Sequence, residues 1–276
     1  MTRAALAATD QACSPAPRAG ETRDHFLGGA LILAQPERGY RAGLDAVLLA
    51  SAAPLGDGEV ATVADVGAGV GTVGLCIARR SGATSLVLIE QDATLCEIAT
   101  RNAALNGLSD RVRIVRFEIG SKVTRSVGAP TSPDLTAPPV ASIDHAVANP
   151  PYFPAGQHRM PTSAAKAAAR MMPIGGIEAW ARFCARIVRP GGSLTLIYPA
   201  AALRQILSAL EGRFGAIEIK PVLPYSDREA VRILFRARKG SRAPLSIVPP
   251  LVVHQRDGSF TPDVAQICQG PASLSW

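Results

Sequence analysis

The chain has 276 residues, of which 47% are hydrophobic, so it is long enough to bury a full α/β core as one large domain with attachments. Its 29 Lys and Arg against 22 Asp and Glu give a net charge of +7, which favours polyanions such as RNA, although a basic surface kept for solubility has the same composition. The sequence lacks a run of about 18 apolar residues and an apolar signal-peptide core, so we expect a cytoplasmic protein without a membrane span.

The cysteine and histidine residues give no sign of a metal site. The five Cys and four His are scattered along the chain without the spacing of metal ligands. We therefore expect no bound metal, and we expect the cysteines to be buried thiols in a reducing compartment. The oligomeric state is not indicated by the sequence.

The N-terminal part divides into a leader and a cap. Residues 1–24 are rich in Ala, Thr, Pro and Arg without an apolar period, which predicts a disordered leader. A short N-terminal cap is expected over residues 25–59, with a strand at 31–33 and a helix over 44–53 that Pro54 ends.

From residue 60 to residue 240, short β-rich runs alternate with helical stretches, which is typical of βαβ units. The expected strands are 62–66, 85–90, 112–117, 143–148, 193–198, 216–221 and 230–237. The expected helices are 72–80, 93–106, 176–188 and 200–212. This pattern predicts an α/β fold with a doubly wound, seven-stranded, mostly parallel sheet.

Two stretches depart from the alternation. Residues 120–142 are rich in Ser, Thr, Pro and Ala, which predicts a mobile, Pro-rich surface insertion in place of a helix. Residues 241–276 contain several prolines and predict an extended C-terminal tail rather than a second domain.

A glycine-rich turn, Asp65-Val66-Gly67-Ala68-Gly69-Val70-Gly71, ends the first strand of the alternation and opens a helix. A doubly wound sheet receives a nucleotide-like ligand at such a place, because glycines let the ligand approach the backbone and the helix N-terminus supplies N–H donors. Glu90 ends the second strand, 19 positions after Gly71, where a carboxylate can accept hydrogen bonds from two vicinal ribose hydroxyls. We therefore expect the ligand to be a nucleoside.

The glycine turn alone leaves the kind of nucleoside open. The stretch from Gly69 to Gly74 also matches the GxGxxG fingerprint of nicotinamide dinucleotides, and a tight turn that binds nothing has the same sequence. Asp65 favours a methyl donor, because an anion before the first glycine would repel a pyrophosphate but could orient the glycine loop and the ammonium of a methionine moiety.

The segment Asn149-Pro150-Pro151-Tyr152 directly follows the apolar strand at 143–148 and is expected beside the glycine turn. Two prolines fix the backbone and leave the Pro150 carbonyl as a rigid acceptor, while Asn149 adds a side-chain carbonyl oxygen. Both hydrogens of a conjugated amine could be held there, with its lone pair drawn towards a sulfonium methyl and Tyr152 stacking on the ring. Neither Asn nor Pro accepts a proton, so the proton would leave to water, and the cofactor as electrophile removes the need for a metal. The alternative is that this segment is a structural loop, stiffened by its prolines and with a buried tyrosine, that takes no part in catalysis.

With these motifs in this order, the chain resembles the amino-group methyltransferases that carry an N-P-P-Y motif. Among them it resembles the bacterial tRNA methyltransferases that modify adenine N6 in the anticodon loop of valine tRNA. The likeness runs from Ala34 to Phe260 and includes the segment Tyr-Arg-Ala-Gly-Leu-Asp-Ala-Val-Leu-Leu at 40–49. It implies a Rossmann-like class I methyltransferase domain over residues 25–240, S-adenosylmethionine as cofactor and tRNA as partner.

The resemblance also assigns site residues by position. It implies a donor site made of Asp45, Asp65, Gly67, Ala68, Gly69, Gly71, Glu90, Glu118 and Asn149. It implies Asn149, Pro150 and Tyr152 as the catalytic residues. Glu118 departs from the family's pattern, in which an Asp usually follows the third strand.

Two basic segments could contact a nucleic acid. On the strand at 230–237 and directly after it, Arg232, Leu234, Arg236 and Arg238 alternate with apolar residues, so one face is largely cationic, as a solvated sheet face also would be. The loop after Tyr152 carries Arg159, Lys166 and Arg170, and its composition suits a lid that orders over an RNA loop.

The first functional hypothesis is methylation of adenine N6 in a tRNA anticodon loop, where the bases are already unstacked. Methylation of a protein glutamine amide is an alternative for which the N-P-P-Y motif is equally suitable. A nicotinamide-dependent reductase and a non-catalytic RNA-binding module stay open as functions of another class.

Overall fold

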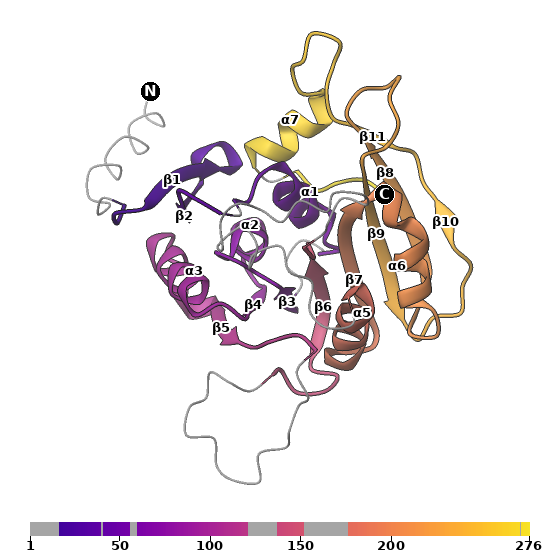
Figure 1. Ribbon diagram of the computed structural model, residues 1–276, viewed down its shortest axis with the longest axis horizontal. Helices are drawn as coiled ribbons and strands as arrows, with labels where there is room; N and C mark the ends of the chain where they lie inside the picture. Colours follow the sequence, from indigo (N-terminus) through magenta and orange to yellow (C-terminus); the bar gives the residue numbers. More distant parts are fainter. Residues whose placement is uncertain (1–16, 40, 56–59, 121–136, 152–175, 271) are drawn as a thin grey trace, which may run out of the picture.

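The computed structural model describes residues 17–39, 41–55, 60–120, 137–151, 176–270 and 272–276. Within these residues, nine strands form one mixed sheet and two strands form a separate hairpin (Figure 1). Four predicted features lie outside the described residues: the leader up to residue 16, the insertion over 121–136, Tyr152, and the basic loop with Arg159, Lys166 and Arg170. Among the described residues, no helix is long and apolar enough to cross a bilayer, and no three potential metal ligands gather.

Five parallel strands form the larger part of the sheet. They are β3 (Thr62–Val66), β4 (Ser85–Glu90), β5 (Val112–Arg116), β6 (Ile143–Ala148) and β7 (Val188–Pro199). The chain moves outward from β3 through β4 to β5, then returns to place β6 and β7 on the other side of β3. This reversal beside β3 is the topological switch point, where open α/β sheets bind their ligands.

The other side of the sheet is mixed, with antiparallel pairs around β9 and parallel pairs at the β8 edge. β9 (Arg232–Lys239) runs antiparallel between β7 and β8 (Phe214–Leu223). Two short strands, β10 (Ser246–Ile247) and β11 (Leu251–Val252), pair with β8. The sheet therefore contains the seven expected strands, and the two short strands extend it at the β8 edge.

Helices cover both faces of the sheet, as a doubly wound fold requires. One face carries α1 (Leu44–Ala52), α2 (Thr72–Arg80), α3 (Ala93–Leu105) and α7 (Pro262–Gln269). The other carries α5 (Gly176–Ile187) and α6 (Leu203–Leu210). Neighbouring residues of the central strands alternate between the two cores, so these strands are buried on both sides. Short 3₁₀ turns, η2 (Leu27–Gly29), η3 (Ser109–Arg111) and η5 (Ala200–Ala202), connect the elements.

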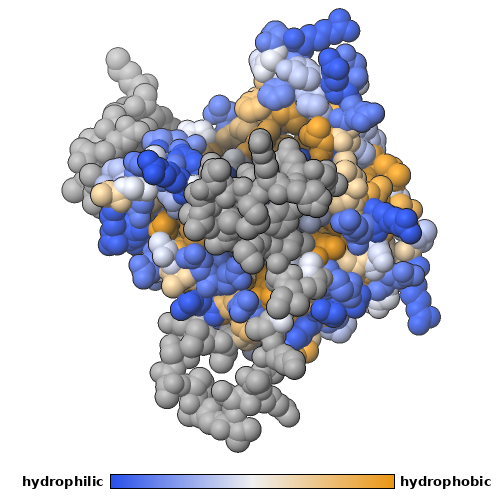
Figure 2. Space-filling model, in the orientation of Figure 1, coloured by the Kyte–Doolittle hydropathy of each residue, from blue (hydrophilic) through white to orange (hydrophobic). Residues whose placement is uncertain are grey.

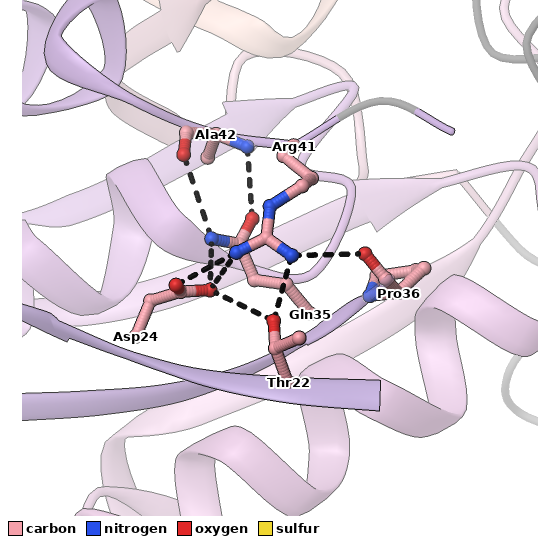
Figure 3. A network of polar contacts seen from close by, with 6 residues as sticks. All are labelled: Thr22, Asp24, Gln35, Pro36, Arg41 and Ala42. Carbon is pink, nitrogen blue, oxygen red and sulfur yellow. Dashed lines mark hydrogen bonds and ion pairs between the residues drawn. The ribbon is translucent and has the colours of Figure 1, made fainter. Parts of the chain in front are cut away.

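The N-terminal cap begins earlier than its composition predicts. β1 (Glu21–Phe26) pairs antiparallel with β2 (Leu31–Pro36), so residues 21–24 belong to a strand and not to the expected disordered leader. Composition does not predict this strand, because β1 lacks an apolar period. It is held by pairing with β2 and by polar side chains. The Asp24 carboxylate accepts hydrogen bonds from Arg41 at 2.7 Å and from the buried Gln35 side chain at 2.9 Å (Figure 3).

The C-terminal segment is not extended throughout, contrary to the expectation for residues 241–276. It contains α7, which has Pro262 in its first turn and Gly270 directly after its end, both of which are ordinary helix boundary residues. Backbone carbonyls of the segment accept hydrogen bonds from the Arg80 guanidinium, at 2.8 Å for Ile267 and 2.6 Å for Ala272. Pro262 therefore marks the start of a helix, and the segment packs on the domain through Arg80.

Two arginines of the cationic face predicted for β9 are paired within the protein. Arg232 bonds to Asp45 of α1 at 3.0 Å, and Arg236 bonds to Glu218 of β8 at 2.7 Å. The Arg236 guanidinium also lies over the Trp276 ring, 4.4 Å from its centroid. Arg232 and Arg236 are thus neutralised and Leu234 is fully buried, so Arg238 is the exposed member of the face that the alternation predicted.

Candidate active site

The glycine turn joins β3 to α2 at the switch point. Gly67, Gly69 and Gly71 have φ of 73°, 57° and 88°, in the left-handed region that glycine adopts most readily. The backbone N–H groups of Gly67 and Ala68 both donate to the Ile89 carbonyl, at 2.8 and 2.9 Å. The turn is therefore anchored to the end of the neighbouring strand β4 before α2 begins.

The space around the turn differs between its glycines. Among the described residues, no atom would lie within 4 Å of a β-carbon on Gly69, so this part of the chain leaves the backbone there open to a ligand. A β-carbon on Gly67 would overlap the indole ring of Trp180, a buried residue in the first half of α5. The turn is thus closed by Trp180 at Gly67 and accessible at Gly69.

Asp65 is buried at the end of β3 and supports the turn. Its carboxylate accepts a 2.8 Å hydrogen bond from the Gly74 N–H in α2. Burial raises the pKa of Asp65 to about 7; the Gly74 bond opposes this shift, and the nearby Glu90 charge adds to it. The third glycine of the literal GxGxxG match, Gly74, therefore gives Asp65 a donor and lets α2 pack closely against Leu88 of β4.

Glu90 is held at the end of β4 by three backbone N–H groups. Gly69 donates to one carboxylate oxygen at 2.9 Å, while Gln91 and Asp92 donate to the other at 2.8 and 3.0 Å. A carboxylate has about four lone-pair positions, so acceptor capacity remains for a sugar hydroxyl. The bond to Gly69 also joins the carboxylate to the open part of the glycine turn.

The acceptor segment lies next to the glycine turn. Ala148 of β6 is paired in register with Val66 of β3, so Asn149 and Gly67 follow at the same level on neighbouring strands. Parallel strands are about 4.8 Å apart, which brings the two segments together at one edge of the sheet. Pro150 is buried and Asn149 is half-buried.

Two further predicted site residues lie around this edge. Asp45 is in the first turn of α1, where it forms the ion pair with Arg232, the residue that faces the end of β7. Glu118 follows β5 and is exposed. Asp45 therefore ties α1 to β9 in this structure, and its contact with a cofactor stays a prediction, as does that of Glu118.

A buried asparagine connects the N-terminal cap to the glycine turn. Asn102 of α3 bonds to the Ala34 backbone in β2 through both of its side-chain groups, at 2.8 and 3.0 Å. Its amide also donates to the Val70 carbonyl in the turn at 3.0 Å. The cap is therefore connected directly to the turn that it adjoins.

Sequence reasoning did not single out Trp180 or Asn102. The period of Trp180, Phe183, Cys184 and Ile187 indicates only that this face of α5 is buried. For Asn102, the signal in the sequence is weaker still: it is a polar residue in a helix that is expected to pack on the sheet. Their contacts with the glycine turn are long-range and cannot be derived from the local pattern.

The comparisons with known proteins identify the family. The methyltransferase small domain model matches residues 46–219. This chain belongs to the methyltransferase small domain family. Among curated proteins, it is similar to the tRNA1(Val) (adenine(37)-N6)-methyltransferase of Aeromonas hydrophila, at 29% identity over 82% of this chain and 88% of the relative. The Dickeya chrysanthemi enzyme of the same name is 28% identical over 87% of each chain.

A solved structure has the same fold as this chain. A predicted O-methyltransferase from Agrobacterium tumefaciens has a TM-score of 0.66 and 29% identity, covering 83% of this chain and 98% of its own. The expected resemblance and the class I fold are thus confirmed, and the protein is an S-adenosylmethionine-dependent methyltransferase. The open backbone at Gly69 and the oriented Glu90 carboxylate beside it are the features of the turn that fit this nucleoside cofactor.

Proposed function

We propose that this methyltransferase transfers the methyl group of S-adenosylmethionine to the exocyclic N6 of an adenine in a tRNA anticodon loop. The observation that carries the proposal is the pairing of Val66 with Ala148, which aligns Gly67 with Asn149 at the switch point. An amine acceptor and a methyl donor must meet within contact distance, and this register supplies adjoining segments for the two.

On the acceptor side, two oxygens would hold the two hydrogens of the amine. Asn149 offers its side-chain carbonyl oxygen, and the Pro150 carbonyl is fixed because both that residue and the next are prolines. Held in this way, the amine nitrogen directs its lone pair out of the ring plane. From its place in the motif, Tyr152 would stack on the base. The proton would leave to water, because none of these groups accepts it.

On the donor side, the glycine turn and Glu90 would share the cofactor. S-adenosylmethionine supplies the electrophilic methyl group when bound. We assign its ribose hydroxyls to Glu90 and its methionine end to Gly67, Ala68 and Gly69. Gly71 would contribute the left-handed residue before α2, and Asp65 would hold the turn in place. Glu118 would lie near the adenine ring, and Asp45 and Asn149 would complete the site.

The names of the relatives support tRNA as the substrate, and so does the net charge of +7. A loop adenine is already unpaired, so the enzyme need not extract it from a duplex. A tRNA substrate would place the enzyme in the cytoplasm. Transfer to a protein glutamine amide uses the same acceptor chemistry and is the competing outcome of the test below.

The test is methyl transfer from isotopically labelled S-adenosylmethionine to unmodified tRNA transcripts and to a protein extract in parallel. We expect label in RNA as N6-methyladenosine, located by nuclease mapping in the anticodon loop. Asn149→Ala is expected to lower kcat by about hundredfold or more, since one of two positioning acceptors is lost. Glu90→Gln should act mainly on the donor KM. Label in glutamine alone, or in neither fraction, would contradict the proposal.

A further inference from the structure

Three aromatic rings meet where the loop that follows β8 lies beside the loop that precedes α7. Tyr225 lies in the loop between β8 and β9, while His254 and Phe260 form an isolated β-bridge before α7. The ring centroids of Tyr225 and His254 are 5.6 Å apart, and those of His254 and Phe260 are 5.2 Å apart with nearly parallel planes. The His254 N–H donates to the Pro224 carbonyl at 2.9 Å, which joins the two loops. We refer to Tyr225, His254 and Phe260 as the aromatic platform.

The platform is exposed to solvent although its members are aromatic. Tyr225 is 36% exposed and Phe260 is 39% exposed, whereas most large apolar side chains of the described residues are buried. The imidazole is fixed by a 3.1 Å contact between its Nδ1 and the Gly258 carbonyl. Ordered aromatic rings that are exposed to solvent can stack on nucleobases, because every base has a π-face.

The platform stands at the same edge of the sheet as Asn149. β8 is antiparallel to β9, and β9 is antiparallel to β7, so β8 points in the same direction as β6. The pairing register puts Ile219 level with Ala148, and Leu223 lies four residues further along β8, roughly 13 Å by the rise of a strand. With three strand spacings between β6 and β8, roughly 14 Å, the platform lies roughly 20 Å from Asn149.

The charges around the platform do not favour phosphate. Its two loops carry two cations and three anions, which are Arg228, Arg256, Asp227, Glu229 and Asp257. On the face seen in Figure 2, the loops that project at the top are mainly hydrophilic. A polyanion gains no net attraction here, so contact with RNA would have to come through the bases.

We propose that the aromatic platform stacks on unpaired bases of the RNA substrate while another base of the same loop occupies the acceptor site at Asn149. This inference rests on the proposed function and names the surface that selects an unpaired RNA. Stacking on single-stranded bases is the usual way in which proteins recognise RNA loops, and it requires aromatic rings rather than net positive charge.

The experiment uses the full chain and a synthetic, unmodified anticodon stem-loop RNA that contains the adenine to be methylated. Tyr225→Leu/Phe260→Leu removes the two exposed rings and keeps apolar side chains, while Tyr225→Phe/Phe260→Tyr keeps both rings. Ile247→Ala is the matched control, because Ile247 is an exposed apolar residue, 68% accessible, on the outer strand β10. The single Tyr225→Leu variant is included so that the test does not depend on the double variant folding.

The leucine double variant is expected to raise the RNA Kd and KM at least tenfold, with kcat and the Kd of S-adenosylmethionine unchanged. The single variant should show a smaller increase in the same direction. The ring-preserving variant and Ile247→Ala should match the wild type. The slope of log Kd against log salt should stay the same, since no phosphate contact is removed.

The outcomes separate this inference from the function on which it rests. If the wild type methylates the stem-loop and the leucine variants do so with unchanged KM, the platform does not bind RNA, while the proposed function stands. If the leucine variants lose methylation of a protein and not of RNA, the platform serves a protein partner and the inference is wrong. If the wild type methylates no RNA, the proposed function fails, and the inference fails with it.

Discussion

The indole ring of Trp180 lies directly against the backbone of Gly67, so a helix on one face of the sheet closes one side of the turn that leads to a helix on the other face. Trp180 is separated from Gly67 by more than a hundred residues of sequence. This contact fixes the turn next to the acceptor segment and makes Gly67 sensitive to any side chain.

Gly67→Ala is expected to destabilise the protein by about 3 kcal/mol, because an alanine would adopt a left-handed φ and overlap a buried ring. Gly69→Ala is the matched control, since its φ is also positive but the surrounding space is open. We expect it to cost about 1 kcal/mol and to weaken donor binding. Urea unfolding and calorimetric titration measure the two effects, and equal losses of stability would contradict the role of Trp180.

Trp180 should report occupation of the donor site by its fluorescence. The chain has two tryptophans, and Trp276 is stacked with Arg236 away from the glycine turn. In Trp276→Phe, addition of S-adenosylhomocysteine is expected to change the emission of Trp180 with a saturable curve. In Trp180→Phe, the remaining Trp276 should show little change even though calorimetry detects binding. A response confined to Trp276 would place the donor elsewhere.

Asp65 should make stability fall as the pH rises. Its pKa is about 7 in the folded protein against an ordinary value near 4, so its favourable contribution is present below pH 4 and is lost as the pH rises to 7. Asp65→Asn keeps an acceptor for the Gly74 N–H and removes the charge. Relative to wild type, this variant is expected to gain about 4 kcal/mol between pH 4 and pH 8, as an order of magnitude.

The measurement is urea unfolding of both proteins across this pH range, compared as a difference so that the other titrating groups cancel. Parallel curves would mean that Asp65 is ionised at the same pH in both the folded and the unfolded protein. A gain that appears only as the pH falls would reverse the assigned sign.

Asn102→Ala is expected to cost about 3 kcal/mol and to weaken donor binding. The substitution leaves the backbone groups of Ala34 and the Val70 carbonyl buried without the partner that the asparagine supplies. Asn106→Ala is a useful comparison, because Asn106 bonds to Ile32 in a half-buried position where water can replace it. Thermal unfolding should rank Asn102→Ala as the more damaging, and the reverse order would contradict the proposed link to the turn.

The sequence by itself determined the elements that build the centre of the fold. The strands at 62–66, 85–90 and 143–148 and the helix at 72–80 have the predicted bounds, because each is an apolar run or an amphipathic period with a clear boundary. The order of these elements also predicts the glycine turn and the N-P-P-Y segment at one edge of the sheet, since parallel strands end together.

The tertiary structure alone decided which side chains meet there. β1 is polar and is held by β2 and Arg41, which lie beside it, and two arginines of β9, Arg232 and Arg236, are paired by Asp45 and Glu218 from other elements. The burial of Asp65 and the contact of Trp180 with Gly67 likewise depend on how α2 and α5 pack against the sheet. Local preference acts over a few neighbouring residues, whereas these contacts join segments far apart in the chain and exist only once the core has packed.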